Sequence, residues 1–222
     1  MRRLVACVSI AFLLPCLAHA SEPSGWYVGG AVGSSKYDAS KSNLDSSVKT
    51  VVAIAVPGFS ATNFSSNLSN NKTGYKLQLG YQFNPYLAVE GGYVDLDNVN
   101  YSSNFSVGLG SGTFKTSLRS SGWNTNIVGA LPVSEKLSLL GKVGFIDAKV
   151  ETTFGGTATV GGVTTPISFS TSSTKWKPVY GLGASYSITN NIAVRGEWDR
   201  YSKLGDAEID VDLLSVGVVY KF

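Results

Sequence analysis

Three segments of the chain repeat one pattern, and this pattern limits the possible fold more than any other feature. Residues 79–96, 128–145 and 182–201 each contain an alternating stretch, a short turn and a second alternating stretch. Apolar residues alternate with polar or small ones at a period of two, which indicates β-strands whose two faces have different surroundings. Since the pattern recurs about every 50 residues, we expect consecutive antiparallel hairpins.

Two further alternating stretches complete the set of strands. One precedes the hairpins, and the other, "VDLLSVGVVYKF", ends the chain. We therefore expect eight strands, near 25–38, 73–83, 87–97, 118–133, 137–150, 175–188, 192–203 and 209–222. Most of them reach the roughly 9–11 residues that a tilted strand needs to cross a bilayer.

The connections between these strands differ in length in a regular way. Tight turns are expected at residues 84–86, 134–136 and 189–191, and a short connection near 204–208. The other three connections are long and rich in Ser, Thr, Asn and Gly, and we interpret them as loops at 39–72, 98–117 and 151–174. Short turns on one side and long loops on the other are typical of outer-membrane barrels. The apolar stretch 51–59 in the first loop is interpreted as an extension of the barrel strands rather than a hydrophobic tip.

The two faces of the predicted strands differ in composition. One face collects apolar and aromatic residues, among them Tyr75, Leu77, Leu79, Tyr81, Phe83, Leu139, Val143, Leu182, Val194 and Trp198. The other face collects many glycines and serines together with Lys76, Gln78, Gln82, Glu90, Lys142, Arg195 and Glu197. A soluble barrel would show the same alternation turned inside out. Aromatics at strand ends and small residues on the polar face favour a narrow barrel in a bilayer.

The sequence therefore predicts an all-β fold, an eight-stranded antiparallel transmembrane β-barrel. A closed barrel must pair its last strand with its first, because an open edge in lipid would leave amides unsatisfied. We accordingly expect the terminal strand to be structural to its last residue, with Tyr220 and Phe222 facing acyl chains. Only 15% of the residues are charged, against roughly 25% in soluble domains.

The first twenty residues have the three-part layout of a secretory signal peptide. A basic start is followed by an apolar run and by Ala18-His19-Ala20, so we predict cleavage after residue 20 and a barrel domain over 21–222. A membrane anchor is the alternative, but the run is short and contains Pro15, whereas a spanning helix needs roughly 20 apolar residues. A lipoprotein site at Cys16 is the other alternative, and Pro15 argues against it too.

Removal of the leader takes away the residues on which most enzyme chemistry depends. Cys7, Cys16 and His19 are the cysteines and the histidine of the chain, and all three lie within residues 1–20. The mature chain would have neither thiol nor imidazole, which excludes disulfides, histidine acid–base catalysis and His/Cys metal sites. We therefore expect no catalytic residues, no metal site and no cofactor. No basic run suggests nucleic-acid binding.

Several of these stretches resemble the OmpA-type transmembrane domain of Gram-negative bacteria. They are "GWYVGGAVGSSKYD", "GYQFNPYLAVEGGYVDL", "KPVYGLGASYSITNNIAVRGEWDRYSKLGD" and "LLSVGVVYKF". The resemblance implies an outer-membrane location and recognition of the last strand, with Tyr220 and Phe222, by the barrel-assembly machinery. The family often continues into a peptidoglycan-binding domain, and since this sequence stops at Phe222 we do not carry peptidoglycan anchoring over.

The resemblance also implies an ion-pair network inside the barrel. Glu90 and Arg195 match the family's strand-3 glutamate and strand-7 arginine, whereas the family's strand-4 lysine has no counterpart at positions 126–128. Lys142 is the candidate replacement, and Lys76 and Glu197 complete the predicted network of charges in the lumen.

These expectations lead to a function and to two alternatives. We expect an outer-membrane barrel with an envelope-structural role and at most weak porin-like permeability, in contact with lipid and lipopolysaccharide. The first alternative is a surface adhesin or recognition protein that meets a host surface through loops 39–72, 98–117 and 151–174. The second is a barrel enzyme, which the missing histidines disfavour.

Charged residues toward the loop side are interpreted as solvated or lipopolysaccharide-facing rather than as a cation site. The acids are Asp95, Asp97, Asp199, Asp206, Asp210 and Asp212. The bases are Lys115, Lys175 and Lys203, which could meet lipid phosphates.

Overall fold

The structure is a computed structural model, and it describes residues 24–38, 42, 45–46, 49–50, 63–69, 71–107, 110–160, 162–205 and 208–222. The predicted leader 1–20, the apolar stretch 51–59 and Asp206 lie outside these residues. None of the described residues belongs to a helix that is long and apolar enough to cross a membrane.

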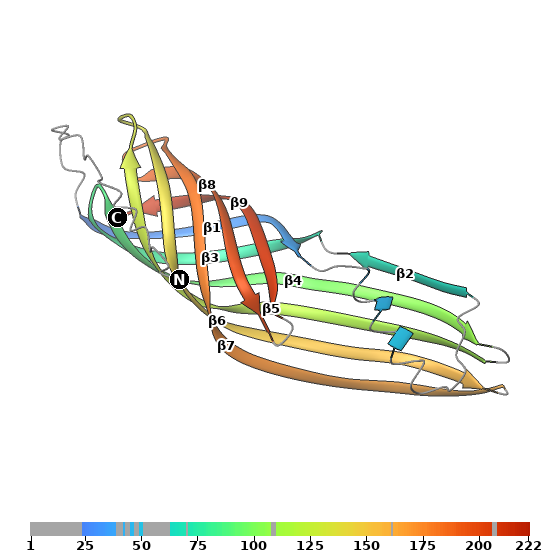
Figure 1. The fold of residues 1–222 in the computed structure, drawn as a ribbon. Helices are drawn as coiled ribbons and strands as arrows, with labels where there is room; N and C mark the ends of the chain where they lie inside the picture. The colour runs from blue at the N-terminus through green and yellow to red at the C-terminus, as the bar shows by residue number, and fades with distance from the viewer. Residues whose placement is uncertain are drawn as a thin grey trace, which may run out of the picture.

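Nine strands are described. Their bounds are β1 Gly25–Tyr37, β2 Asn63–Ser69, β3 Asn71–Asn84, β4 Leu87–Val107, β5 Gly110–Pro132, β6 Leu137–Val160, β7 Val163–Ser187, β8 Ile192–Leu204 and β9 Ile209–Lys221. Eight of them form a ring in which each strand pairs antiparallel with two neighbours, from β1 through β3 to β9 and back to β1 (Figure 1). The predicted eight-stranded antiparallel barrel is confirmed, and β2 is an additional strand that pairs with β4 outside the ring.

The ring closes through the first and the last strand of the chain. β1 and β9 pair without interruption from Tyr27 opposite Lys221 to Tyr37 opposite Val211. The Phe222 amide donates a further hydrogen bond to the Trp26 carbonyl, at 3.0 Å. The closure leaves no open edge in the ring, which is the condition for burying a sheet in hydrocarbon.

Three short turns lie together at one end of the barrel, which we call the turn end. Each begins with a side chain that accepts a hydrogen bond from the backbone two or three residues later, as Asx and ST turns do. Asn84 Oδ1 accepts from the Tyr86 amide at 2.8 Å, Ser134 Oγ from the Leu137 amide at 3.1 Å, and Thr189 Oγ1 from the Ile192 amide at 3.0 Å. The three tight turns expected from the sequence are thus present.

Two of the three predicted loops are strands instead. β4 and β5 stay paired to Val107 opposite Gly110, and β6 and β7 to Val160 opposite Val163. The interpretation of 98–117 and 151–174 as loops was wrong, because Ser and Thr content was read as loop polarity although Thr, Phe and Val favour strands. Gly162, with φ of 83°, supplies the left-handed backbone for one of the two distal turns.

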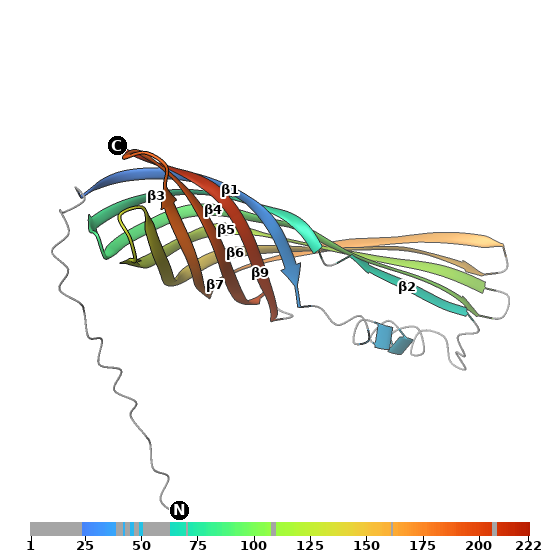
Figure 2. The same ribbon diagram turned by 90° about the horizontal axis from the view of Figure 1, so that it is seen from above.

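The strands β4 to β7 continue beyond the ends of β1, β8 and β9 and, together with β2, form a part of the same sheet outside the barrel, which we call the extension (Figures 1 and 2). Its inner face, continuous with the barrel interior, carries an aromatic row made of Phe64, Phe105, Phe114, Phe154 and Phe169. Its outer face carries mainly Ser, Thr and Asn. The extension therefore has an apolar inner face and a polar outer face, whereas the exterior of the barrel is apolar.

Described residues of the first long connection contact the inner face of the extension. Asp45 accepts a hydrogen bond from the Tyr101 hydroxyl at 2.7 Å, and the Lys49 ammonium lies 4.8 Å from the centre of the Phe64 ring. Burial and the neighbouring Asp45 carboxylate raise the pKa of Tyr101 to about 12. These contacts tie Asp45 to β4 and Lys49 to β2.

The barrel exterior has an apolar middle between two aromatic girdles. At the turn end Trp26 packs against Tyr81 with ring centres 5.2 Å apart, and Tyr220 against Phe222 at 5.3 Å. Toward the extension, the edge-on pairs are Tyr93 with Trp123 and Tyr180 with Trp198. Between the girdles, large aliphatic side chains that include Leu79, Ile127 and Val216 are more than half exposed. Such a belt matches a bilayer and its two interfaces.

Changing Tyr220 and Phe222 to Ser, or deleting Phe222, is expected to impair insertion of the barrel. The two rings are 45% and 74% exposed on the closing strand, so the changes remove lipid-facing apolar area and, in the deletion, the bond to Trp26. Heat-modifiable mobility of the outer-membrane fraction measures this, with Tyr86→Ser, an exposed aromatic at the same end but outside β9, as control. Normal folding of the Tyr220 and Phe222 variants in cells would contradict the prediction.

Candidate functional site

The five charged residues expected in the lumen lie inside the barrel and close together. Lys76 comes from β3, Glu90 from β4, Lys142 from β6, and Arg195 and Glu197 from β8. All five are at most 9% exposed. The period of two places them inside because their neighbours along each strand face outward.

Direct ion pairs connect these side chains across the lumen. Arg195 Nη1 bonds to Glu90 Oε1 and lies 4.0 Å from Glu197 Oε1. Glu197 is also bonded by Lys76 and, at 2.9 Å, by Lys142 Nζ. Glu197 is therefore the carboxylate that joins the three bases into one network.

Asp199 belongs to this network, although the sequence was interpreted to place it among the solvated acids. It is fully buried, and its two carboxylate oxygens lie 2.7 Å from Lys76 Nζ and 2.8 Å from Lys142 Nζ. The correction has a simple physical basis, because Asp199 follows Glu197 by two residues on the same strand and must share its face. The network then contains three acids and three bases and is formally neutral.

Tyr27 is a second member that the sequence reasoning missed. Its hydroxyl donates a hydrogen bond to Glu90 Oε1 at 2.7 Å, and the Arg195 guanidinium lies 5.5 Å from the centre of its ring. The ring has room because residue 80 is glycine, and a Cβ there would collide with it. Trp26 and Val28 flank Tyr27 in β1 and face outward. This alternation could have predicted that Tyr27 faces the lumen.

Above the network, toward the extension, the lumen is filled by apolar side chains. We call this group the apolar layer, and it consists of Tyr37, Val94, Leu96, Val99, Ile146, Ala148, Val150, Val179, Tyr201, Leu204, Val211 and Leu213. The polar interior expected from the sequence is absent in this part of the barrel, so that expectation was wrong. On β8 the inward positions change from Arg195, Glu197 and Asp199 to Tyr201 and Leu204.

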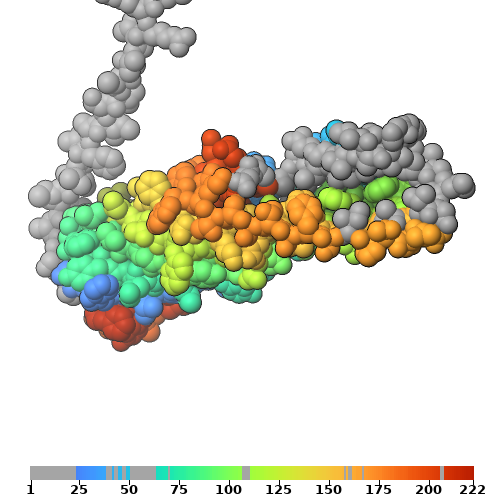
Figure 3. Space-filling view, turned by 90° about the horizontal axis from the view of Figure 1, so that it is seen from below, coloured from blue at the N-terminus to red at the C-terminus, as the bar shows by residue number. Residues whose placement is uncertain are grey.

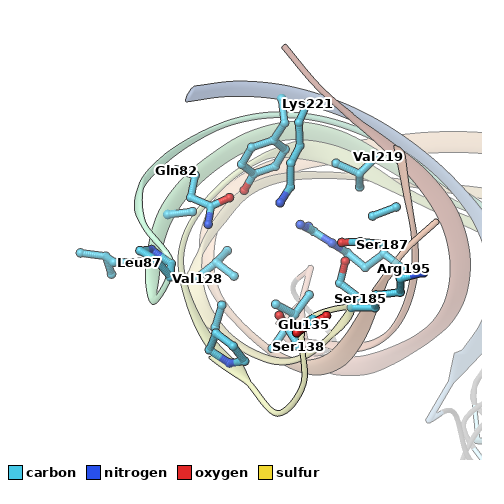
Figure 4. Close-up of a pocket in the computed structure, with 18 of the residues that line it drawn as sticks. Gln82, Leu87, Val128, Glu135, Ser138, Ser185, Ser187, Arg195, Val219 and Lys221 are labelled. Atoms are coloured by element: carbon cyan, nitrogen blue, oxygen red, sulfur yellow. The ribbon is translucent and has the colours of Figure 1, made fainter. Parts of the chain in front are cut away.

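Below the network, the turn end opens into a cavity of about 560 Å³, which we call the vestibule. Ala88, Val128, Leu140 and Val219 form a small apolar cluster with Tyr27 on its wall. Figure 4 looks along the ring of strands into this cavity, with Gln82, Val219 and Arg195 among the labelled side chains. The network is thus reached from the turn end through the vestibule, and the apolar layer separates it from the extension.

The remaining acids near the extension are engaged by neighbouring groups. Asp95 Oδ2 lies 2.6 Å from Arg119 Nη2, and Asp212 Oδ1 lies 2.7 Å from Arg200 Nε. Asp210 accepts a hydrogen bond from the Lys203 amide at 2.8 Å. Within the described ranges no group of three or more His, Cys, Asp or Glu side chains is placed to hold a metal ion.

Comparison with known proteins gives consistent results. The family model of the outer membrane protein beta-barrel domain matches residues 4–222. Outer membrane protein A of Klebsiella pneumoniae is 27% identical over 211 residues, which are 91% of this chain and 52% of that protein. Outer membrane protein A of Yersinia pseudotuberculosis is 28% identical over 212 residues, 91% of this chain and 50% of that protein. The chain therefore spans about half the length of these curated relatives.

A solved structure of similar fold is that of the outer membrane protein OprG from Pseudomonas aeruginosa. It shares 15% sequence identity, and the match covers 90% of this chain and 96% of that chain with a TM-score of 0.50. This likeness concerns the fold alone.

A double-mutant cycle on Glu90 and Arg195 is expected to show strong coupling. Arg195→Ala leaves a buried carboxylate without its base, which costs about 3–5 kcal/mol, whereas Glu90→Ala together with Arg195→Ala removes both charges. The interaction energy should lie in the upper part of the roughly 0.5–3 kcal/mol found for contacting residues, and above that of an exposed pair. Urea unfolding from lipid vesicles, followed by tryptophan fluorescence, measures it.

The matched control is the solvent-exposed pair Lys149 and Glu151, whose charged atoms are 2.6 Å apart. Because both side chains are about half exposed, their coupling should not exceed about 1 kcal/mol. Simple additivity at Glu90 and Arg195 would show that the two buried residues are not coupled.

Proposed function

Since the chain belongs to the outer membrane protein β-barrel domain family, as an OmpA-like barrel of the bacterial outer membrane, we propose that it is a structural barrel with a closed lumen. The observation that carries this proposal is the filling of the lumen in two successive levels. A neutral network of buried ion pairs occupies the middle, and the apolar layer fills the part toward the extension.

The two levels oppose permeation in different ways. An ion that enters from the vestibule meets charges that are already neutralised by short contacts, so it gains little by displacing them. Beyond them, buried side chains such as Leu96, Ile146 and Leu213 leave it few polar groups with which to replace its hydration shell. The weak porin-like permeability considered from the sequence is therefore limited, in this proposal, to rare leakage.

Features of the barrel exterior suit contact with the partners that a structural barrel needs. We assign the turn end to the periplasm, because short turns face that side in outer-membrane barrels, and the extension to the cell exterior. The aromatic girdles would then contact lipid and lipopolysaccharide, and the exposed Tyr220 and Phe222 on the closing strand would serve the barrel-assembly machinery. We propose no catalytic role and no cofactor.

Surface recognition is a second candidate function, and the extension is the observation that favours it. Four ring strands continue well past the outer girdle, in paired β-structure rather than as loops. A barrel that only anchors itself in lipid has no need of such a sheet. The adhesin alternative therefore shifts from loops 98–117 and 151–174 to the strands that replace them.

Planar-bilayer recordings of the mature protein test the closed lumen. The wild type should show no stable open level, and Arg195→Ala should remain closed because the apolar layer is intact. Conductance should rise only when the layer is truncated as well, as in Arg195→Ala combined with Leu96→Ala, Tyr201→Ala and Leu213→Ala. Leu79→Ala, Ile127→Ala and Val216→Ala, on the lipid-facing surface, serve as the control combination.

A stable conducting level in the wild type would overturn the proposal. Opening by Arg195→Ala alone would assign the closure to the charges and not to the apolar layer. Heat-modifiable mobility confirms in each case that the variant barrel is folded.

A further inference from the structure

β7 has a long edge that none of the described strands covers. It pairs with β6 from Val163 onward, but with β8 only from Val179 to Ser187. Residues 163–178 therefore have one described neighbour strand, and they form the side of the extension that faces away from β4 and β5 (Figure 1). Figure 3 shows the orange atoms of β7 along the exposed side of the extension.

One stretch of this edge lacks the residues that would prevent another strand from pairing with it. Alternate residues of an edge strand direct their N–H and C=O groups away from the sheet, and proteins commonly protect such edges with proline or charge. Pro166 and Lys175 bound the stretch, and residues 167–174, "ISFSTSST", contain neither a proline nor a charged residue. Eight residues at about 3.3 Å each present roughly 26 Å of strand.

The side chains of the edge define what could pair there. On the inner face the Phe154 and Phe169 rings are stacked with their centres 4.6 Å apart, and Phe114 lies 6.1 Å from Phe154. Phe169 ends this row at the edge and is 58% exposed. On the outer face Ser168, Ser170 and Ser172 are exposed hydroxyl-bearing neighbours.

We propose that residues 167–174 of β7 form a β-augmentation site for an extended segment of another protein, which adds to the extension as an antiparallel strand. Main-chain hydrogen bonds supply the affinity in such sites, and alternate side chains the selectivity. The segment fits when it is uncharged and places an aromatic or branched side chain beside Phe169, with small polar residues on the opposite face. The inference deepens the surface-recognition role and does not depend on the closed lumen.

A second copy of this protein in the same membrane should pair with the β7 edge less stably than a segment of another protein, for a geometric reason. Every copy inserts in the same orientation, so β7 runs from the extension to the turn end in each of them. β2 runs in the same direction as β7, because it is antiparallel to β4 and the ring alternates from β4 to β7. Edge pairing between such copies would be parallel, and parallel ladders are slightly less stable per residue. A segment from another protein is free to run antiparallel.

The test uses the mature protein in nanodiscs and a labelled, end-capped ten-residue peptide of alternating Thr and Val around a central Phe. Fluorescence anisotropy is expected to show saturable binding that Ser170→Lys and Phe169→Ser each weaken at least tenfold. Thr153→Lys is the matched control, because Thr153 lies directly opposite Ser170 on β6, is exposed on the same face and has a strand on both sides. It should leave the affinity unchanged.

Two peptides of the same sequence, N-methylated at one or the other set of alternate residues, test whether the backbone carries the binding. One of them should lose affinity much more than the other, since only one set of amides faces β7. Equal binding of both would show adhesion to an apolar face and overturn the proposal, as would equal binding by wild type and Ser170→Lys.

Self-association tests the competing occupant. A dimer in sedimentation of the wild type that Ser170→Lys abolishes, without any peptide binding, would overturn the proposal in favour of pairing between copies. Conductance of the same protein preparations is recorded in planar bilayers, so a failure of the closed lumen is distinguishable from a failure of this inference.

Discussion

Every other feature of the molecule depends on the need to satisfy backbone amides inside hydrocarbon. A sheet that crosses a bilayer cannot keep an open edge, so the last strand must return to the first, and β9 pairs with β1 down to the bond between Phe222 and Trp26. Closure with eight strands leaves an interior only wide enough for side chains. Charges in that interior lose most of their water, and three acids must then be matched by three bases.

The inward positions of single strands determine how the lumen is layered. On β8 they pass from Ala193, beside the vestibule, through Arg195, Glu197 and Asp199 to Tyr201 and Leu204. β4, on the opposite side of the ring from β8, changes in the same way, since Glu90 is followed by Val94 and Leu96 among its buried inward residues. The lumen is therefore polar in the middle and apolar toward the extension, which separates the network from that end of the barrel.

The alternation of apolar and polar residues was enough to predict the strands of the barrel and the inward charges. It can be read from each strand by itself, without knowing which strands are neighbours. It should have identified Asp199 and Tyr27 as well, but Asp199 was grouped with other acids by its position near a connection. The pairing of Glu197 with two lysines could not be predicted, since it depends on the register between β3, β6 and β8. The extension was missed for a different reason. Serine is frequent in loops, whereas threonine and aromatic residues favour strands, and the weight of these second residues was underestimated.

The central claim is that the lysines of the lumen are buried ion-pair partners and not side chains of a water-filled pore. Nitrogen-15 NMR of the lysine ammonium groups in nanodiscs tests it most directly. Lys76 and Lys142 should give distinct ammonium signals whose protons exchange slowly with water, and Asp199→Asn should speed that exchange for both. The exposed Lys149 and Lys203 supply the fast-exchanging reference. If Lys76 and Lys142 exchange as fast as these two, water reaches the network freely and the account of a closed lumen is wrong.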